Sequence, residues 1–243
     1  MTYCVGMILD KGLVFMSDTR TNAGLDNIST FSKLKTWEAP GECVLTLMSA
    51  GNLATTQSVV SMLDEPIRRT DERQSTLLCA PSMFQAALLV AETLHEVIET
   101  RADAGQKAEN AFNATMILGG QVAGGPPRLF LIYPEGNFIE AAEDTPFFQI
   151  GEMKYGRPIL IRAYDRKMNF EEAMKLLLVS FDSTLKANLT VGAPFDYHLY
   201  EADSLVSGHA GRIEIDDPYF QKVSESWGDA LKSALDSLEN FKF

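Results

Sequence analysis

The sequence is poor in the residues that bind metal ions or build disulfide frameworks. It has 3 cysteines and 3 histidines among 243 residues. Cys4, Cys43 and Cys79 form no CxxC pair, and no cluster of histidines accompanies them. Neither a disulfide framework nor a zinc site is therefore predicted. We expect no metal or organic cofactor, and we expect the reducing environment of the cytoplasm.

Long apolar runs and an excess of basic residues are also absent. The longest apolar run, residues 86–91, is far shorter than the roughly 20 residues that cross a bilayer. The first residues lack the charged and then apolar segments of a signal peptide. Lysine and arginine total 21 against 33 acidic residues, which gives a net charge of −12. This argues against nucleic acid and anionic membranes as partners, because both need a basic face.

What remains is the composition of an ordinary globular protein. Hydrophobic residues make up 46% and charged residues 22% of the chain. Its length lies within the range of a single α/β domain with a sizeable core. Internal repeats, low-complexity segments and an interdomain linker are not evident. We therefore expect one domain over residues 1–243.

Apolar spacing predicts helices and strands along the whole chain. The clearest helix is 82–101, where an apolar stripe recurs at helical spacing. Further helices are expected at 53–63, 155–164, 170–187 and 219–243. Strands are expected at 5–10, 13–16, 31–37, 43–49, 113–119, 128–133, 138–141, 197–205 and 209–215, with loops at 21–30, 66–73 and 102–110. The apolar face of the last helix is expected to pack on its own domain or on a neighbouring subunit.

Thr2 is the candidate nucleophile. Because the side chain after Met1 is small, we expect an aminopeptidase to remove Met1 and leave Thr2 with a free α-amino group. Such an amine has a pKa of about 8, so part of it is unprotonated near neutral pH. It can then accept the hydroxyl proton while the oxygen attacks a carbonyl. This is the threonine version of a nucleophile paired with its base.

A predicted hairpin places Asp18 near this threonine. Residues 5–10 and 13–16 have the pattern of short strands, and Lys11-Gly12 between them has the composition of a turn. A hairpin returns the chain on itself. The end of the second strand, with Asp18, therefore lies beside the start of the first strand.

A lysine from the next strand completes the expected group of charges. Lys33 falls in the segment 31–37, and its ammonium would lower the pKa of the neighbouring amine and stabilise the alkoxide. Asp18 would pair with this lysine and fix it. Lys35 is an alternative, because residues two apart share one face of a strand.

A strand-to-helix junction supplies a candidate oxyanion site. The apolar segment 43–49 runs directly into Ala50-Gly51-Asn52, after which the helical segment 53–63 begins. Glycine permits close approach of the backbone, and free N–H groups at a helix start suit an anion. Backbone donors of this kind stabilise the oxyanion of acyl transfer. A plain tight turn would have the same composition.

The order of these motifs along the chain resembles that of the proteasome β-subunits. The residues within the motifs resemble those of the bacterial branch called Anbu, the ancestral β-subunit. The motifs are Met1–Gly6, Ser17–Gly24, Asp26–Phe31, Lys33-Leu34 and Ser49–Ala54. The resemblance covers essentially the whole chain and is most specific over residues 2–57. It implies an α+β fold of the N-terminal-nucleophile hydrolases. This fold is a four-layer αββα sandwich, with two stacked antiparallel sheets between helical layers.

The resemblance also assigns roles to residues. It implies Thr2 as the nucleophile, Asp18 and Lys33 as its charged partners, and Gly51 as an oxyanion donor through its backbone N–H. The spacing from Thr2 to the lysine is one residue shorter than in proteasome β-subunits, so a gap in the loop is required. Lys33 is preferred to Lys35 because an aliphatic residue follows it, as in the family.

Two more positions enter through the resemblance. Asp182 resembles the aspartate near the end of a helix that orients the N-terminal amine, although a solvated or capping aspartate fits nearly as well. Gly151 corresponds to a family glycine that is followed by a helper serine. Here Glu152 follows it and adds a negative charge near the site.

The function implied by the resemblance is a threonine-type peptidase subunit. It would hydrolyse peptides or unfolded proteins through an acyl-enzyme, inside a homo-oligomeric ring or open helical stack. Whether an ATPase feeds the particle is left open. Two alternatives keep the fold: an amidase acting on small amides, and a non-catalytic assembly protein. Retention of Met1 would favour the assembly protein, because a blocked amine cannot act as the base.

Overall fold

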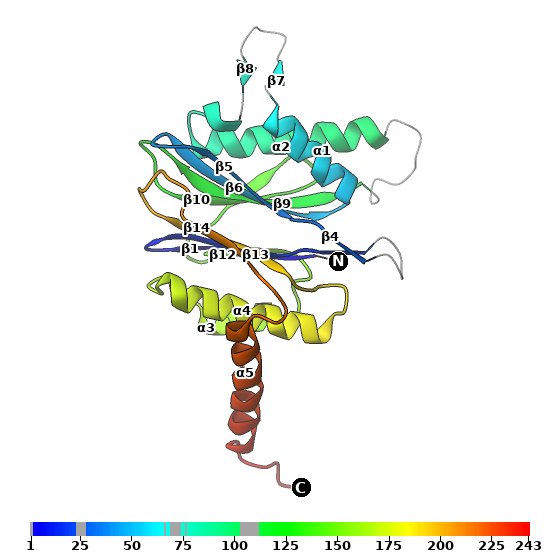
Figure 1. Ribbon diagram of the computed structural model, residues 1–243, viewed down its shortest axis with the longest axis vertical. Coiled ribbons are helices and arrows are strands. Elements are labelled where there is room, and N and C mark those ends of the chain that lie inside the picture. Colours follow the sequence, from blue (N-terminus) through cyan, green and yellow to red (C-terminus); the bar gives the residue numbers. More distant parts are fainter. Residues whose placement is uncertain (1, 23–27, 66, 69–73, 76, 103–111) are drawn as a thin grey trace.

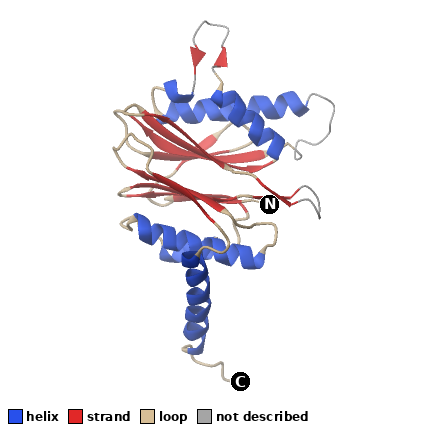
Figure 2. Ribbon diagram, viewed as in Figure 1, coloured by secondary structure: helices blue, strands red, loops and turns tan. Residues whose placement is uncertain are grey.

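The protein is a stack of four layers. The computed structural model describes residues 2–22, 28–65, 67–68, 74–75, 77–102 and 112–243. Helices α1 (Leu53–Asp64) and α2 (Met83–Ala102) cover one sheet, and helices α3 (Arg157–Ala163) and α4 (Phe170–Ala187) cover the other (Figures 1 and 2). Helix α5 (Pro218–Asp236) points away from the stack (Figure 1). The helix–sheet–sheet–helix order confirms the predicted sandwich.

The first sheet carries the N-terminal strand. Its order is β12-β1-β2-β13-β14, and every pairing is antiparallel. The predicted hairpin is formed by β1 and β2, whose register sets Cys4 opposite Ser17. Asp18 therefore ends its strand beside the start of β1. The strands are β1 (Tyr3–Leu9), β2 (Gly12–Asp18), β12 (Phe147–Gly151), β13 (Phe195–Glu201) and β14 (His209–Ile213).

The second sheet lies on top of the first and carries the strand-to-helix junction. Its order is β11-β10-β9-β6-β5, again antiparallel throughout. The strands are β5 (Leu34–Ala39), β6 (Cys43–Gly51), β9 (Ala114–Val122), β10 (Arg128–Ile132) and β11 (Phe138–Glu140). Short elements complete the described chain: β3 (Arg20–Asn22), β4 (Ile28–Thr30), β7 (Ile67–Arg68), β8 (Gln74–Ser75) and the 3₁₀ turn η1 (Leu77–Cys79).

The core is divided by the two sheets into three apolar layers. Tyr3, Val5 and Met7 of β1 face α3 and α4, whereas Cys4 faces the space between the sheets. Because both faces of β1 and β2 are covered, these strands are apolar almost throughout instead of alternating. The layer between β6 and α2 is built mainly from leucine, valine and alanine.

Several predicted boundaries are wrong. The segment 21–30, expected as a loop, contributes to the antiparallel pair β3–β4. The expected strand 197–205 ends at Glu201, because Asp203 and Leu205 adopt positive φ angles of 64° and 47° and turn the chain. The helix expected over 219–243 ends at Asp236. Most of the loops expected at 66–73 and 102–110 lie outside the described residues.

The strand expected over 113–119 continues to Val122, because its two glycines sit inside the sheet. A Cβ at Gly119 would lie 2.6 Å from the Phe15 ring, so the missing side chain makes room for a phenylalanine of the facing sheet. Gly120 has a φ of 155°, which is open to glycine. No helix in the described part of the chain is both long and apolar enough to cross a membrane.

His198 joins the two sheets. Its side chain is fully buried on β13, and its Nδ1 lies 2.8 Å from the Thr46 hydroxyl on β6. Its Nε2 lies 3.3 Å from the Ser207 hydroxyl, and its ring stacks on Phe15. Burial lowers the pKa of His198 to about 4, with Glu38 acting in the opposite direction. The neutral ring is therefore the form that the folded protein contains.

We predict that, because of His198, the free energy of unfolding decreases as the pH falls from about 6.5 towards 4. In this range the unfolded chain binds a proton at residue 198 and the folded chain does not, so folding is opposed. At about pH 4.5 the loss is roughly 2–3 kcal/mol. Denaturant unfolding of wild type and His198→Gln at neutral and acidic pH measures it. Equal losses in both proteins would contradict the prediction.

Candidate active site

Thr2 lies at the edge of an open cleft. It precedes β1, is 9% exposed, and stands beside a cleft of about 770 Å³. Both sheets and α1 line this cleft. The lining residues relevant to the site are Thr2, Arg20, Lys33, Lys35, Ser49, Gly51, Leu53, Gln57 and Gly151. The cleft offers the space that a peptide chain would need in front of the threonine.

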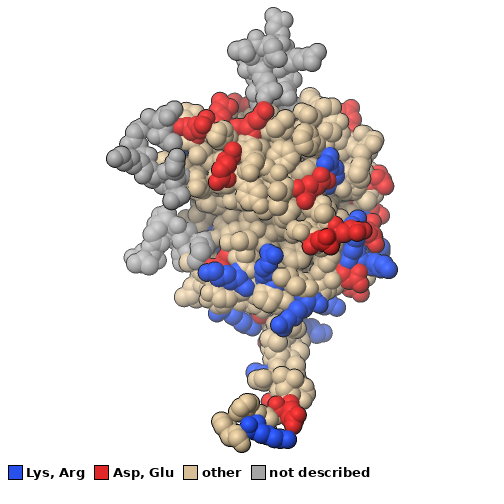
Figure 3. Space-filling model, turned by 180° about the vertical axis from the view of Figure 1, so that it is seen from behind, with Lys and Arg blue, Asp and Glu red and all other residues tan. Residues whose placement is uncertain are grey.

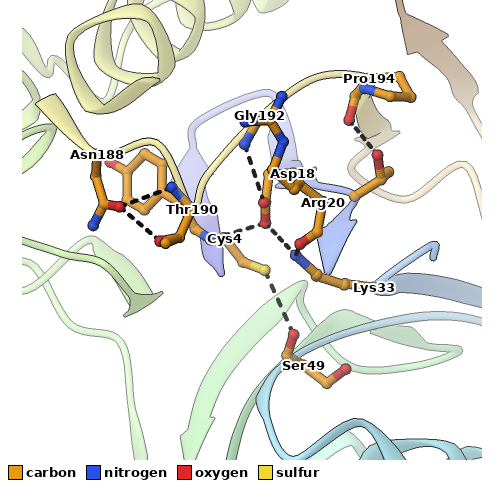
Figure 4. Close-up of polar contacts among 11 residues, drawn as sticks. Cys4, Asp18, Arg20, Lys33, Ser49, Asn188, Thr190, Gly192 and Pro194 are labelled. Carbon is orange, nitrogen blue, oxygen red and sulfur yellow. Dashed lines mark hydrogen bonds and ion pairs between the residues drawn. The ribbon is translucent and has the colours of Figure 1, made fainter. Parts of the chain in front are cut away.

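Asp18 and Lys33 form a buried ion pair at the end of the β1–β2 hairpin (Figure 4). The Lys33 Nζ lies 2.7 Å from the Asp18 Oδ1, and the side chains are 7% and 0% exposed. The ammonium also donates to the Arg20 carbonyl at 2.6 Å. The carboxylate accepts the Tyr3 N–H at 2.9 Å and the Gly192 N–H at 3.4 Å. Each charge is therefore paired and further hydrogen-bonded, as burial requires.

The negative charge of Asp18 is stabilised by its neighbours. Burial raises the pKa of the Asp18 carboxyl, while Lys33 and the two backbone N–H groups act in the opposite direction. Burial also raises the pKa of the Cys4 thiol, whose Sγ lies 3.7 Å from the Ser49 carbonyl. Such a thiol is a poor nucleophile. The Cys4 thiol is therefore not expected to compete with the Thr2 hydroxyl, whose role as the nucleophile stays a prediction.

The contacts of the two candidate lysines distinguish them. Lys35 pairs with Asp64 at 3.1 Å, and their side chains are 43% and 40% exposed. It also lies over the Trp37 ring, 5.6 Å from its centre. Lys33 precedes β5, which begins one residue later than this lysine, so the expected shared strand face does not apply. Of the two, the structure brings Lys33 to Asp18.

Gly51 lies at the junction between β6 and α1. It ends β6, lines the cleft with Thr2, and is followed by the Asn52 cap of α1. Its φ of 128° lies in the region that favours glycine. A Cβ there would lie 2.3 Å from the Asn113 carbonyl oxygen, so a side chain is sterically excluded. Its role as an oxyanion donor stays a prediction.

Asp182 has a different set of contacts from those of the other four residues. It is 2% exposed on α4 and accepts a hydrogen bond from Lys186, one turn later, at 3.0 Å. Lys186 also donates to Ser224 on α5 at 2.9 Å. None of the contacts found among the described residues joins Asp182 to Thr2. The role of Asp182 in orienting the N-terminal amine stays a prediction.

The segment 188–194 contributes more to the site than sequence reasoning indicated. It leaves α4 and passes over the ends of β1 and β2 (Figure 4). The Leu189 carbonyl accepts from Arg20 at 2.8 Å, and the Pro194 carbonyl accepts from the Thr19 hydroxyl at 2.7 Å. A Cβ at Gly192 would meet the Arg20 guanidinium at 2.3 Å. In the sequence, Gly192 within a polar loop was the one feature that could have indicated this close contact.

Gly151, which entered the sequence analysis through the resemblance, contacts the backbone of Thr2. It has a φ of 84°, and a Cβ there would lie 1.9 Å from the Thr2 carbonyl oxygen. The next residue, Glu152, donates its backbone N–H to the same oxygen at 2.7 Å. The backbone of Thr2 is thus held by β12, because only glycine allows the two strands to approach this closely.

Comparison with known proteins identifies the family to which this chain belongs. The sequence pattern described as "Proteasome subunit" matches residues 2–194, which is more than half of the chain. The chain therefore belongs to the proteasome subunit family. A proteasome subunit beta of Methanocaldococcus vulcanius is 26% identical over 195 residues, which cover 79% of this chain and 78% of the relative.

Solved structures indicate the branch of the family. Anbu (ancestral beta-subunit) from Yersinia bercovieri is 49% identical, with a TM-score of 0.90 and 100% of both chains covered. Anbu from Hyphomicrobium sp. strain MC1 is 50% identical, with a TM-score of 0.90 and the same coverage. The helical assembly of the Anbu complex from Pseudomonas aeruginosa is 48% identical, with a TM-score of 0.91, and 99% of this chain and 98% of that chain are covered. The resemblance to Anbu read from the sequence is confirmed.

We predict that Lys33→Ala destabilises the fold far more than Lys35→Ala. Removing Lys33 leaves the buried Asp18 carboxylate without its cation, which costs about 3–5 kcal/mol. Removing Lys35 breaks a half-exposed pair worth about 0–1 kcal/mol. Urea unfolding of both variants measures the difference. Similar losses in the two variants would show that the Asp18–Lys33 pair does not stabilise the fold as described.

Proposed function

We propose that this chain is a threonine-type peptidase subunit, in which Met1 is removed and Thr2 acts as the nucleophile. The observation that carries the proposal is the position of Thr2. It stands at the mouth of a cleft, next to the buried Asp18–Lys33 pair and across from Gly51. The scarcity of cysteine is consistent with a cytoplasmic location.

The proposed reaction uses the first residue twice. The free α-amine of Thr2 accepts the hydroxyl proton as the Oγ attacks the peptide carbonyl. The Lys33 ammonium stabilises the developing alkoxide, and the Gly51 N–H donates to the oxyanion of the tetrahedral intermediate. Return of the proton to the leaving amine gives an acyl-enzyme on Thr2. Water, activated by the same amine, then releases the acyl group and restores the hydroxyl.

We predict that Thr2→Ala abolishes covalent labelling by an inhibitor directed at N-terminal threonine, and that Thr2→Ser retains it. Alanine removes the attacking oxygen, whereas serine keeps both the oxygen and the amine. The intact mass of the labelled protein, purified from its native host, reports the adduct and the absence of Met1 together. Equal labelling of Thr2→Ala, or a mass that includes Met1, would contradict the proposal.

The last helix supports an assembly of several copies. On α5 only Phe220 is buried, whereas Leu231 is 50% and Leu235 is 69% exposed. Beyond the helix, Leu238 is 68% and Phe241 is 81% exposed. In the view from behind, the visible surface of α5 is largely uncharged (Figure 3). Most of the stability of a helix in a protein comes from packing of its apolar face, and little of this face is covered here. We propose that a second copy of the chain covers it, as part of a homo-oligomer.

We predict that Leu231→Glu combined with Leu235→Glu shifts the protein to smaller species. Two charges on the apolar face of α5 oppose burial against another subunit. Ser233→Glu, on the same helix and exposed, is the matched control and leaves the size unchanged. Sedimentation velocity measures the distribution. An unchanged distribution for the double variant would place the contact between subunits elsewhere.

A further inference from the structure

Glu152 stands directly across from the nucleophile. It follows Gly151 at the end of β12, and the register of this strand with β1 sets Tyr3 opposite Gly151. The Glu152 backbone N–H donates to the Thr2 carbonyl at 2.7 Å. Residues opposite one another on antiparallel strands have Cβ atoms about 4.5–5.5 Å apart. The Glu152 side chain therefore starts within reach of the Thr2 backbone.

The Glu152 carboxylate is buried and held in place. The residue is 7% exposed. The Asn188 amide donates to its Oε2 at 2.8 Å, and the Lys154 backbone N–H donates to its Oε1 at 3.4 Å. Both of these donors are uncharged. No ion pair with a lysine, arginine or histidine was found for this carboxylate among the described residues, so its charge is without a described counter-ion.

The residue that holds the carboxylate is itself fixed. The Asn188 Oδ1 accepts the Thr190 N–H at 3.0 Å and the Thr190 hydroxyl at 2.6 Å (Figure 4). Two residues later, the Gly192 N–H donates to Asp18. One short loop thus binds Glu152 at its start and Asp18 further on. The two residues also contact neighbouring backbone groups, because Asp18 accepts the Tyr3 N–H and the Glu152 N–H donates to the Thr2 carbonyl.

We propose that the Glu152 carboxylate is the counter-ion of the Thr2 ammonium and that Asn188 is its positioning residue. The inference rests on the proposed function, because it requires that Met1 is removed. An N-terminal ammonium beside a buried carboxylate supplies the missing positive charge. The carboxylate holds the amine towards the hydroxyl of its own residue and raises the pKa of that amine.

Glu152 and Lys33 act on the amine in opposite directions. The Lys33 ammonium lowers the pKa of a neighbouring amine, whereas a carboxylate raises it. Asp18 already neutralises Lys33 at 2.7 Å, so Glu152 dominates. The charged residues that line the cleft with Thr2 are Arg20, Lys33 and Lys35, and Asp18 pairs with Lys33. On α4, Asp182 pairs with Lys186. Loss of Glu152 therefore increases the fraction of unprotonated base at neutral pH.

The test measures the pKa of the Thr2 amine directly. Protein whose intact mass shows that Met1 is absent is labelled with trace acetic anhydride across a pH series, and the N-terminal peptide is quantified by mass spectrometry. This readout needs no peptidase turnover, so it stays informative if the proposed peptidase activity fails. We expect Glu152→Gln to lower the pKa by about one unit, which is about tenfold more unprotonated amine at a pH below both values.

Three more variants make the outcome decisive. Glu143→Gln, an exposed position ahead of β12, is the same chemical change away from the site and leaves the pKa unchanged. Asn188→Ala lowers it in the same direction as Glu152→Gln. Glu152→Asp keeps the charge and most of the elevated pKa. An unchanged pKa in Glu152→Gln, or equal shifts in Glu152→Asp and Glu152→Gln, would overturn the proposal.

Discussion

The structure around the cleft depends on one buried ion pair. Asp18 ends β2, the middle strand of the first sheet, and Lys33 directly precedes β5 of the second sheet. Their charged groups meet at 2.7 Å with almost no exposure. Two opposite charges in such a place stabilise the fold only when the remaining hydrogen-bonding positions are also filled. Here the Tyr3 and Gly192 N–H groups and the Arg20 carbonyl fill them. The pair therefore fixes β1, the loop after α4 and β3 relative to one another.

That constraint explains why residues far apart in sequence form one site. The β1–β2 hairpin carries Asp18 back to the first strand, and β6 ends at Gly51 on the facing sheet. The segment 188–194 then passes over the open end of the hairpin, where β1 begins and β2 ends, and contributes four hydrogen-bonding groups. Three of these groups belong to the backbone, and the fourth is the side-chain amide of Asn188. Because backbone positions are set by the fold, the fold sets the geometry of the site.

Some of this arrangement was predictable from local patterns and some was not. The hairpin and the helices α1, α2 and α4 follow from turn residues and apolar periodicity, both of which act over short distances. Lys33 was favoured over Lys35 only through the family resemblance, and the structure pairs it with Asp18. Strand alternation gave no help there, because Lys33 lies outside β5.

The features that sequence reasoning missed depend on contacts between distant segments. The close approach of Gly151 to Thr2 and of Gly192 to Arg20 reflects space left by a neighbour, which no local pattern encodes. The pairing of β12 with β1 brings Gly151 to Thr2, and this pairing is a property of the whole chain. The pair formed by Asp182 and Lys186 differs, because it is local to one helix.

The crowding at Gly151 restricts how this site can diversify. One wall of the cleft is the backbone of Thr2 and β12, where an added methyl group would overlap the Thr2 carbonyl oxygen at 1.9 Å. The opposite wall is formed by side chains of β5, β6 and α1, among them Lys35, Ser49 and Gln57. Redesign of the shape and charge of the cleft therefore has to be made on that second wall, while residue 151 remains glycine.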